Sequence, residues 1–172
     1  MKKLALFVIL VALLLISLVG GGCNPPQGEG FAIYLTAQEL SVGDMRQVAL
    51  SEVQLADKPL ISVNDIVSYS KETHEIELTP DAYALVKQLR LPMTGTVFIV
   101  CVDRKPIYWG LFWSIASSQG PPHDVVYCYI PGALGAPIGS IRLDYPPMYD
   151  SSKDPRSNSE IMRSLDRAGK LK

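Results

Sequence analysis

Apolar and polar residues follow two different periods along the chain, and the change of period marks where a strand gives way to a helix. In the segment His74–Leu78 every second residue is a glutamate, which predicts a half-buried strand paired with Ile66–Ser70 in a hairpin. Thr79-Pro80 is then typical of a helix start, because threonine caps a helix and proline fits its first turn. This helix is expected to bury one apolar stripe, made of Ala82, Leu85, Val86 and Leu89.

Most other apolar runs are short and bounded by turn residues, as strands usually are. They lie at Phe31–Leu35, Glu52–Leu55, Val97–Val102, Ile107–Ser114, Val125–Ile130 and Ile138–Tyr145. A short helix is expected near Thr36–Leu40, a helical turn at Ser62–Asp65, and a final helix from Ser157 through Arg167. Many strands and few helices predict a single α+β domain over residues 31–172, with a mostly antiparallel sheet and two or three helices packed on one side.

The composition shows that the apolar residues are unevenly distributed along the chain. They make up 48% of the 172 residues, but residues 1–22 contain 16 of them, and the other 150 residues are 44% apolar, as in an ordinary globular domain. In the N-terminal part, Lys2 and Lys3 precede the apolar run Leu4–Val19 and then three glycines. A basic start, an apolar segment and small residues predict a secretory signal peptide.

The stretch Leu18–Cys23 resembles the signal of bacterial membrane lipoproteins, although Gly20 stands where that family usually has a large aliphatic residue. The resemblance implies that residues 1–22 are removed and that Cys23 carries lipid such as palmitate. The protein would then lie on the extracytoplasmic face of a cell membrane, or on the outer membrane of a two-membrane bacterium. An uncleaved N-terminal helix and ordinary secretion with a spare thiol are the alternatives.

Residues 23–30 are rich in proline and glycine and predict a flexible tether between the anchor and the domain. Without Lys2 and Lys3, the 16 Lys and Arg become 14, against 17 Asp and Glu. Because binding to nucleic acid needs a basic surface, we expect no nucleic-acid partner. The expected partners are the membrane, through Cys23, and an envelope protein or peptide.

Cys101 and Cys128 form an even pair in an oxidising compartment, which makes a disulfide between two strands one interpretation. The other interpretation is two small buried residues. If a third strand lies between the strand of Cys101 and the strand of Cys128, the two cysteines lie about 10 Å apart. A disulfide tolerates no more than about 7 Å between Cα atoms.

The densest unusual feature is the aromatic segment Ile107–Trp113. If its residues Tyr108, Trp109, Phe112 and Trp113 are exposed, they form a candidate binding surface for a peptide or sugar, with Gly110 allowing close approach. The alternative is a central strand that packs on both faces.

No catalytic motif occurs in the sequence. His74 and His123 are the two histidines and stand 49 residues apart, so we expect no metal site and no cofactor. Ser117-Ser118 near His123 is the local pair that a hydrolase would use. The loops Ser117–His123 and Pro131–Pro137 are placed to form a rim together.

The segment Glu75–Gly132 resembles the first periplasmic domain of the SecD protein-export subunit. A strand that runs into a Thr-Pro helix start (Ile76–Ala82) and a later hairpin (Val97–Ile107) carry this resemblance. Ala82 and Arg104 stand where that family usually has glycine. The resemblance covers about a third of the chain, and it implies an α+β fold and contact with polypeptides but no export activity.

These observations predict a non-enzymatic, membrane-anchored module that binds a protein or peptide at the cell envelope. The alternatives are an envelope hydrolase with an unfamiliar site around His123 and a purely structural envelope protein.

Mass spectrometry of the mature protein tests the anchor. We expect Cys23 to be the first residue and its mass to include lipid on the sulfur. An N-terminus upstream of residue 23, or an unmodified Cys23, would contradict the lipoprotein prediction.

Overall fold

The strands of the molecule form two sheets. The computed structural model describes residues 28–130, 137–146 and 154–172. The larger sheet has the strand order β2 (Ile61–Ser62), β1 (Phe31–Leu35), β5 (Thr96–Val102), β6 (Lys105–Ser114) and β7 (Val126–Ile130). The smaller sheet has the order β3 (Ile66–Tyr69), β4 (Glu75–Leu78) and β8 (Ser140–Arg142). Among the pairs of named strands in the described residues, only β6–β7 is parallel, so the mostly antiparallel α+β prediction is confirmed.

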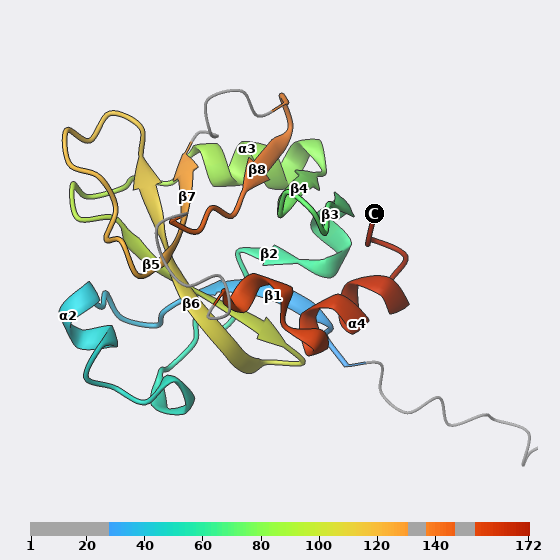
Figure 1. Ribbon diagram of the computed structural model, residues 1–172, viewed down its shortest axis with the longest axis horizontal. Helices are drawn as coiled ribbons and strands as arrows, with labels where there is room; N and C mark the ends of the chain where they lie inside the picture. The colour runs from blue at the N-terminus through green and yellow to red at the C-terminus, as the bar shows by residue number, and fades with distance from the viewer. Residues whose placement is uncertain (1–27, 131–136, 147–153) are drawn as a thin grey trace, which may run out of the picture.

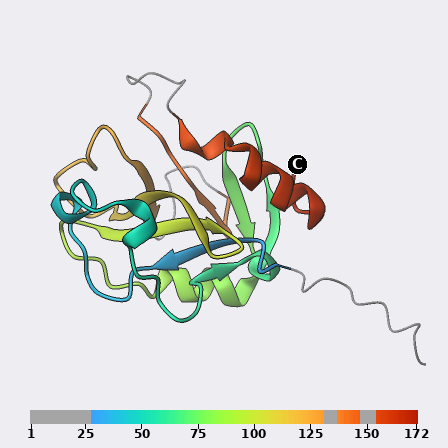
Figure 2. The same ribbon diagram turned by 90° about the horizontal axis from the view of Figure 1, so that it is seen from below.

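Three helices accompany the sheets in the described ranges: α2 (Val42–Met45), α3 (Pro80–Lys87) and α4 (Ser159–Arg167) (Figure 1). The predicted cap of α3 forms, since the Thr79 side chain accepts a hydrogen bond from the backbone of Ala82. Gly169, with a φ of +67°, follows the end of α4. The helices, expected on one side, do not all share one. Side chains of α3 and α4 belong to the same hydrophobic core, whereas Met45 of α2 belongs to the core on the other face of the five-stranded sheet. Figure 2 shows the helices in a second view.

The five-stranded sheet buries side chains on both faces. Alternate residues of β5 show this: Phe98, Val100 and Val102 belong to one core, whereas Val97, Ile99 and Cys101 belong to the other. The large core also takes side chains from the three-stranded sheet, α3 and α4. The smaller core, called the outer core here, is covered by the segment 40–55, which contributes Leu40, Met45, Leu50, Val53 and Leu55.

In the described part of the chain, an isolated antiparallel bridge links β7 of the larger sheet to the segment that follows β8 of the smaller one. The Tyr127 backbone N–H donates to the Asp144 carbonyl at 2.9 Å, and the Asp144 N–H donates to the Tyr127 carbonyl at 2.7 Å. This bridge places β7 beside the segment that follows β8, so the two sheets surround the large core between them.

Several predicted boundaries are wrong, and each has a local cause. The short helix begins at Val42 instead of within Thr36–Leu40, because Ser41 and Asp44 form a capping box there. Of the predicted strand Glu52–Leu55, Glu52 ends a 3-10 turn (Leu50–Glu52), and only Leu55 pairs as a strand does, in an isolated antiparallel bridge with Thr36. The last strand is confined to β8.

Two apolar residues that were predicted to lie in buried elements are exposed. Ile138 is 98% exposed and lies outside the strand predicted for it. Leu85 is 51% exposed, so the buried stripe of α3 is formed by Ala82 and Val86, with Leu89 half-buried.

Gly110 fits its place in β6 because it lacks a side chain. A Cβ atom there would lie against the Phe98 ring and 2.7 Å from the Val126 carbonyl oxygen. The glycine therefore permits close approach of the protein's own core, instead of the close approach of a ligand that the sequence suggested.

We expect Gly110→Ala to lower the free energy of unfolding by about 1–3 kcal/mol, because the added methyl overpacks the core. Gly120→Ala is the matched control, since no atom lies within 4 Å of a Cβ at that exposed position. Urea unfolding of both variants measures the difference. An equal, near-zero change in both would contradict the close packing at Gly110.

Candidate functional site

The four aromatic residues predicted as a binding surface are part of the two cores. Tyr108, Phe112 and Trp113 are 6%, 0% and 4% exposed, and Trp109 is half-buried. Tyr108 and Phe112 pack in the large core, whereas Trp113 and Trp109 pack in or against the outer core. The exposed-surface interpretation is therefore wrong, and the alternative of a central strand packed on both faces is confirmed.

Trp113 instead supports two loops. Its indole Nε1–H donates to the Gln119 carbonyl at 2.9 Å, which holds the loop 115–123 after β6. Its ring also leaves no room for a side chain at Gly95, where a Cβ would lie 2.6 Å from the ring, so the loop 91–96 before β5 packs directly on it. A buried tryptophan thus positions both loops at one end of the β5–β6 pair.

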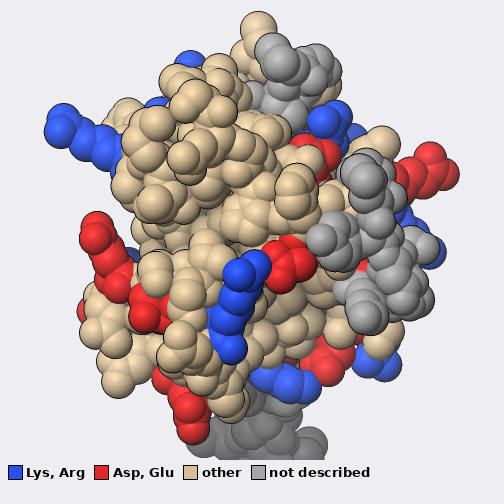
Figure 3. All heavy atoms as spheres, turned by 60° about the vertical axis from the view of Figure 1, so that its left-hand side comes forward, with Lys and Arg blue, Asp and Glu red and all other residues tan. Residues whose placement is uncertain are grey.

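These two loops, residues 91–96 and 115–123, form what we call the loop surface. They contain no Lys, Arg, Asp or Glu, and they expose two large apolar side chains, Met93 (61%) and Ile115 (51%). Figure 3 shows a broad uncharged area on the side of the molecule that carries these loops. Uncharged loops on a rigid sheet are a common setting for recognition.

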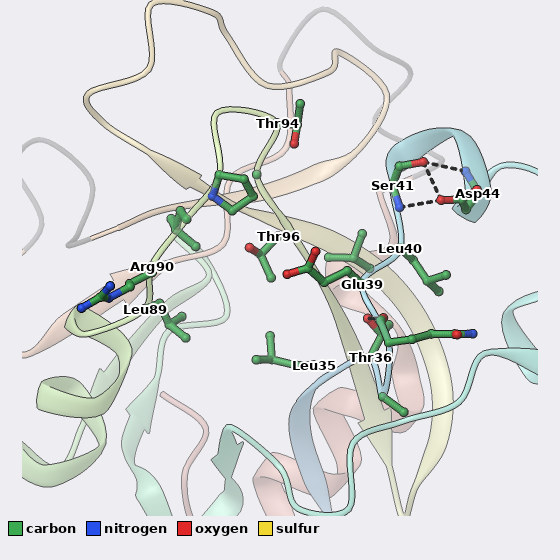
Figure 4. Close-up of a pocket in the computed structure, with 16 residues that line it drawn as sticks. Leu35, Thr36, Glu39, Leu40, Ser41, Asp44, Leu89, Arg90, Thr94 and Thr96 are labelled. Carbon is green, nitrogen blue, oxygen red and sulfur yellow. Dashed lines mark hydrogen bonds between the residues drawn. The ribbon is translucent and has the colours of Figure 1, made fainter.

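A pocket of about 550 Å³ opens beside the loop surface, where β1 ends and β5 begins (Figure 4). The segment 35–41 forms one wall, and residues 89–97, which include the first loop, form the other. Apolar, hydroxyl and charged side chains all line it. The charged ones are Glu39, Asp44 and Arg90.

The three charged groups of the pocket differ in their surroundings. Asp44 is engaged locally, because its carboxylate accepts hydrogen bonds from the Ser41 hydroxyl and backbone, and these bonds lower its pKa. In Figure 4 the Glu39 carboxylate points into the pocket toward Thr96, whereas the Arg90 guanidinium points away. Among the described residues, no ion pair or hydrogen bond engages the Glu39 side chain.

Cys101 and Cys128 are both buried free thiols, so the disulfide interpretation is wrong. Their strands, β5 and β7, are separated by β6, and the two side chains belong to different cores on opposite faces of the sheet. Burial raises the pKa of each thiol to about 12, which makes both unreactive near neutral pH.

His74 lies inside the domain beside other polar groups. It is 6% exposed with a φ of +53°, and its Nδ1 lies 3.0 Å from the Tyr69 hydroxyl. Burial, and after it the positive charge of Arg156, lowers the pKa of His74. Burial alone would raise the pKa of Asp154, but its bidentate hydrogen bonds with Arg156 outweigh burial and lower it. Sequence patterns missed this Asp154–Arg156 pair.

Within the described residues, one buried side-chain oxygen lacks a partner, the Tyr108 hydroxyl, and no group of three or more His, Cys, Asp or Glu side chains is placed to hold a metal ion. His123 is exposed, and the Ser117 hydroxyl accepts a hydrogen bond from the Gln119 backbone instead of contacting His123. Cys23 and most of the loop Pro131–Pro137 lie outside the described residues.

The buried His74 makes stability depend on pH. Because folding lowers its pKa, the unfolded chain takes up the proton at a higher pH than the folded protein does. The free energy of unfolding should therefore fall as the pH drops below 6.5, the ordinary histidine value, by at most about 1.4 kcal/mol per pH unit.

We expect His74→Asn to flatten this decline between pH 7 and pH 5.5, since asparagine does not titrate and tolerates a positive φ. His123→Asn, at an exposed position, should keep the wild-type slope. Denaturant unfolding at each pH measures both. A His74→Asn variant with an unchanged slope would contradict the assignment.

None of the helices in the described part of the chain is long and apolar enough to cross a membrane. Comparisons with protein-family models, with curated proteins and with solved structures find no match for this chain.

Proposed function

We propose that the chain is a membrane-anchored, extracytoplasmic module that binds an envelope protein or peptide through the loop surface, without catalysis. The observation that carries this proposal is that the point where the chain enters the domain and the loop surface lie at opposite ends of the domain. The chain enters the domain at one end of the β5–β6 pair, and the loop surface and pocket lie at the other end.

The entry point is fixed at the turn between β5 and β6. The Gly30 N–H donates to the Asp103 carboxylate at 2.7 Å, and the Asp103 N–H donates to the Gly30 carbonyl at 2.9 Å. The Tyr34 hydroxyl donates to Glu29 at 2.5 Å, and Arg104 lies over the Tyr34 ring. Residues 28–30, predicted as part of the tether, thus belong to the folded domain.

This attachment limits how far the domain can move from the membrane. Five peptide steps separate Cys23 from Gly28, and they span at most about 18 Å. With Cys23 lipidated, the β5–β6 turn stays near the lipid, and the loop surface, about 20 Å further along the strands, faces away from it. In Figure 1 the loops lie on the left and the entry point lies on the right.

The chemistry of the loop surface suits a polypeptide partner. Met93 is flexible and polarizable, so it adapts to different apolar neighbours, and Ile115 adds branched apolar area. The partial resemblance to the SecD domain supports the same class of partner. A hydrolase would need His123 beside a serine, and the Ser117 hydroxyl is bonded to Gln119.

Photo-crosslinking in cells tests this proposal. A photoreactive amino acid is placed at Met93, at Ile115 or, as the control, at Val67, which is 47% exposed on the three-stranded sheet. We expect the positions Met93 and Ile115 to yield one shared adduct, identified by mass spectrometry as the same envelope protein, and Val67 not to yield it. A lack of adducts from both loop positions, or the same adduct from all three, would overturn the proposal.

A further inference from the structure

We infer that the pocket beside the loop surface binds a basic side chain, lysine or arginine, of the partner polypeptide, with Glu39 as its ion-pair partner. This inference rests on the proposed function and deepens it, because it specifies which chemical group of the partner enters the pocket.

Glu39 supplies the charge. Its carboxylate is directed into the pocket, and in the described part of the chain no cation neutralises it. Arg90, the one cation among the lining residues, points away from the pocket in Figure 4. The Oδ2 atom of Asp44 accepts two hydrogen bonds from Ser41, so Glu39 is the lining carboxylate that has both oxygens available to a ligand. An incoming cation would therefore find a negative group without a competing partner.

The walls suit the rest of a basic side chain. Leu35, Leu89 and Leu91 are half-buried and line the pocket, so they can cover the aliphatic stem that lysine and arginine carry below their charge. Acidic and neutral polar side chains have a shorter stem or none. Apolar walls with a carboxylate between them thus favour a long cationic side chain over a short one.

Two hydroxyl groups add hydrogen-bond acceptors to the pocket, and one of them, that of Thr96, lies beside Glu39 in Figure 4. Thr94 and Thr96 line the same pocket, and among the described residues no side-chain hydrogen bond occupies either hydroxyl. Lysine has three N–H donors and arginine five, so one carboxylate does not engage all of them. The two threonine hydroxyls can accept hydrogen bonds from the remaining donors.

The position of the pocket ties it to the loop surface. The loop 91–96 forms a wall of the pocket with Leu91, Thr94 and Thr96, and it also exposes Met93 to solvent. A polypeptide that lies across Met93 and Ile115 is therefore within reach of the pocket with a neighbouring residue. The inference predicts a basic residue next to an apolar contact in the partner.

Two probes that differ only in charge test the inference: N-acetyl-lysine methylamide and N-acetyl-norleucine methylamide, each titrated by NMR into the full chain in detergent micelles. We expect the lysine probe to shift the amides of residues 35–41 and 91–97, and to bind about three- to fivefold more tightly than norleucine, as a partly exposed ion pair allows. Equal binding of the two probes, or no binding of either, would overturn the inference.

The variants separate the charge from the shape of the pocket. Glu39→Gln should reduce the affinity for the lysine probe to that for the norleucine probe, whereas Glu72→Gln, at an exposed turn outside the pocket, should leave it unchanged. An unchanged lysine preference in Glu39→Gln would overturn the inference. The crosslinks from Met93 and Ile115 do not depend on this preference, so their persistence would show that the proposed function stands without it.

Discussion

The pairing of β5 with β6 is the interaction on which the rest of the structure depends. Both strands bury side chains on both faces, so each face has to be covered by another part of the chain. The three-stranded sheet, α3 and α4 cover one face, and the segment 40–55 covers the other. The same pair gives the domain its two ends: the turn Asp103-Arg104 binds Gly30 at the start of the described chain, and the opposite end carries the loop surface.

The sequence predicted those elements whose signals are local. The hairpin of β3 and β4 follows from the alternation of its second arm, β4, and the start of α3 follows from the helix-capping pair Thr79-Pro80. The aromatic segment of β6 was ambiguous, because a strand buried on both faces has no polar face that would show its orientation. The structure resolves that ambiguity in favour of packing, and Gly110 and Trp113 both serve the protein's own contacts.

The pocket had no comparable signal in the sequence. Its two walls, residues 35–41 and 89–97, are about fifty positions apart and meet because β1 pairs with β5. Glu39 alone is an ordinary exposed glutamate, and only its position on the pocket, which Leu35 and Leu89 also line, makes it a candidate ligand residue. Residues 91–102 carry no charged side chain. This run includes both the exposed loop around Met93 and the buried strand β5, and composition does not distinguish the loop from the strand.

The central claim is that opposite ends of the β5–β6 pair serve anchoring and binding. Energy transfer to a headgroup-labelled lipid tests it most directly, with the lipidated protein in vesicles and a fluorophore on a cysteine introduced as Lys105→Cys or Met93→Cys. Cys101 and Cys128 are buried and do not compete for the label. The account predicts strong transfer from position 105 and weak transfer from position 93, because the two ends lie about 20 Å apart along the strands. Equal transfer from both positions, or stronger transfer from position 93, would contradict it.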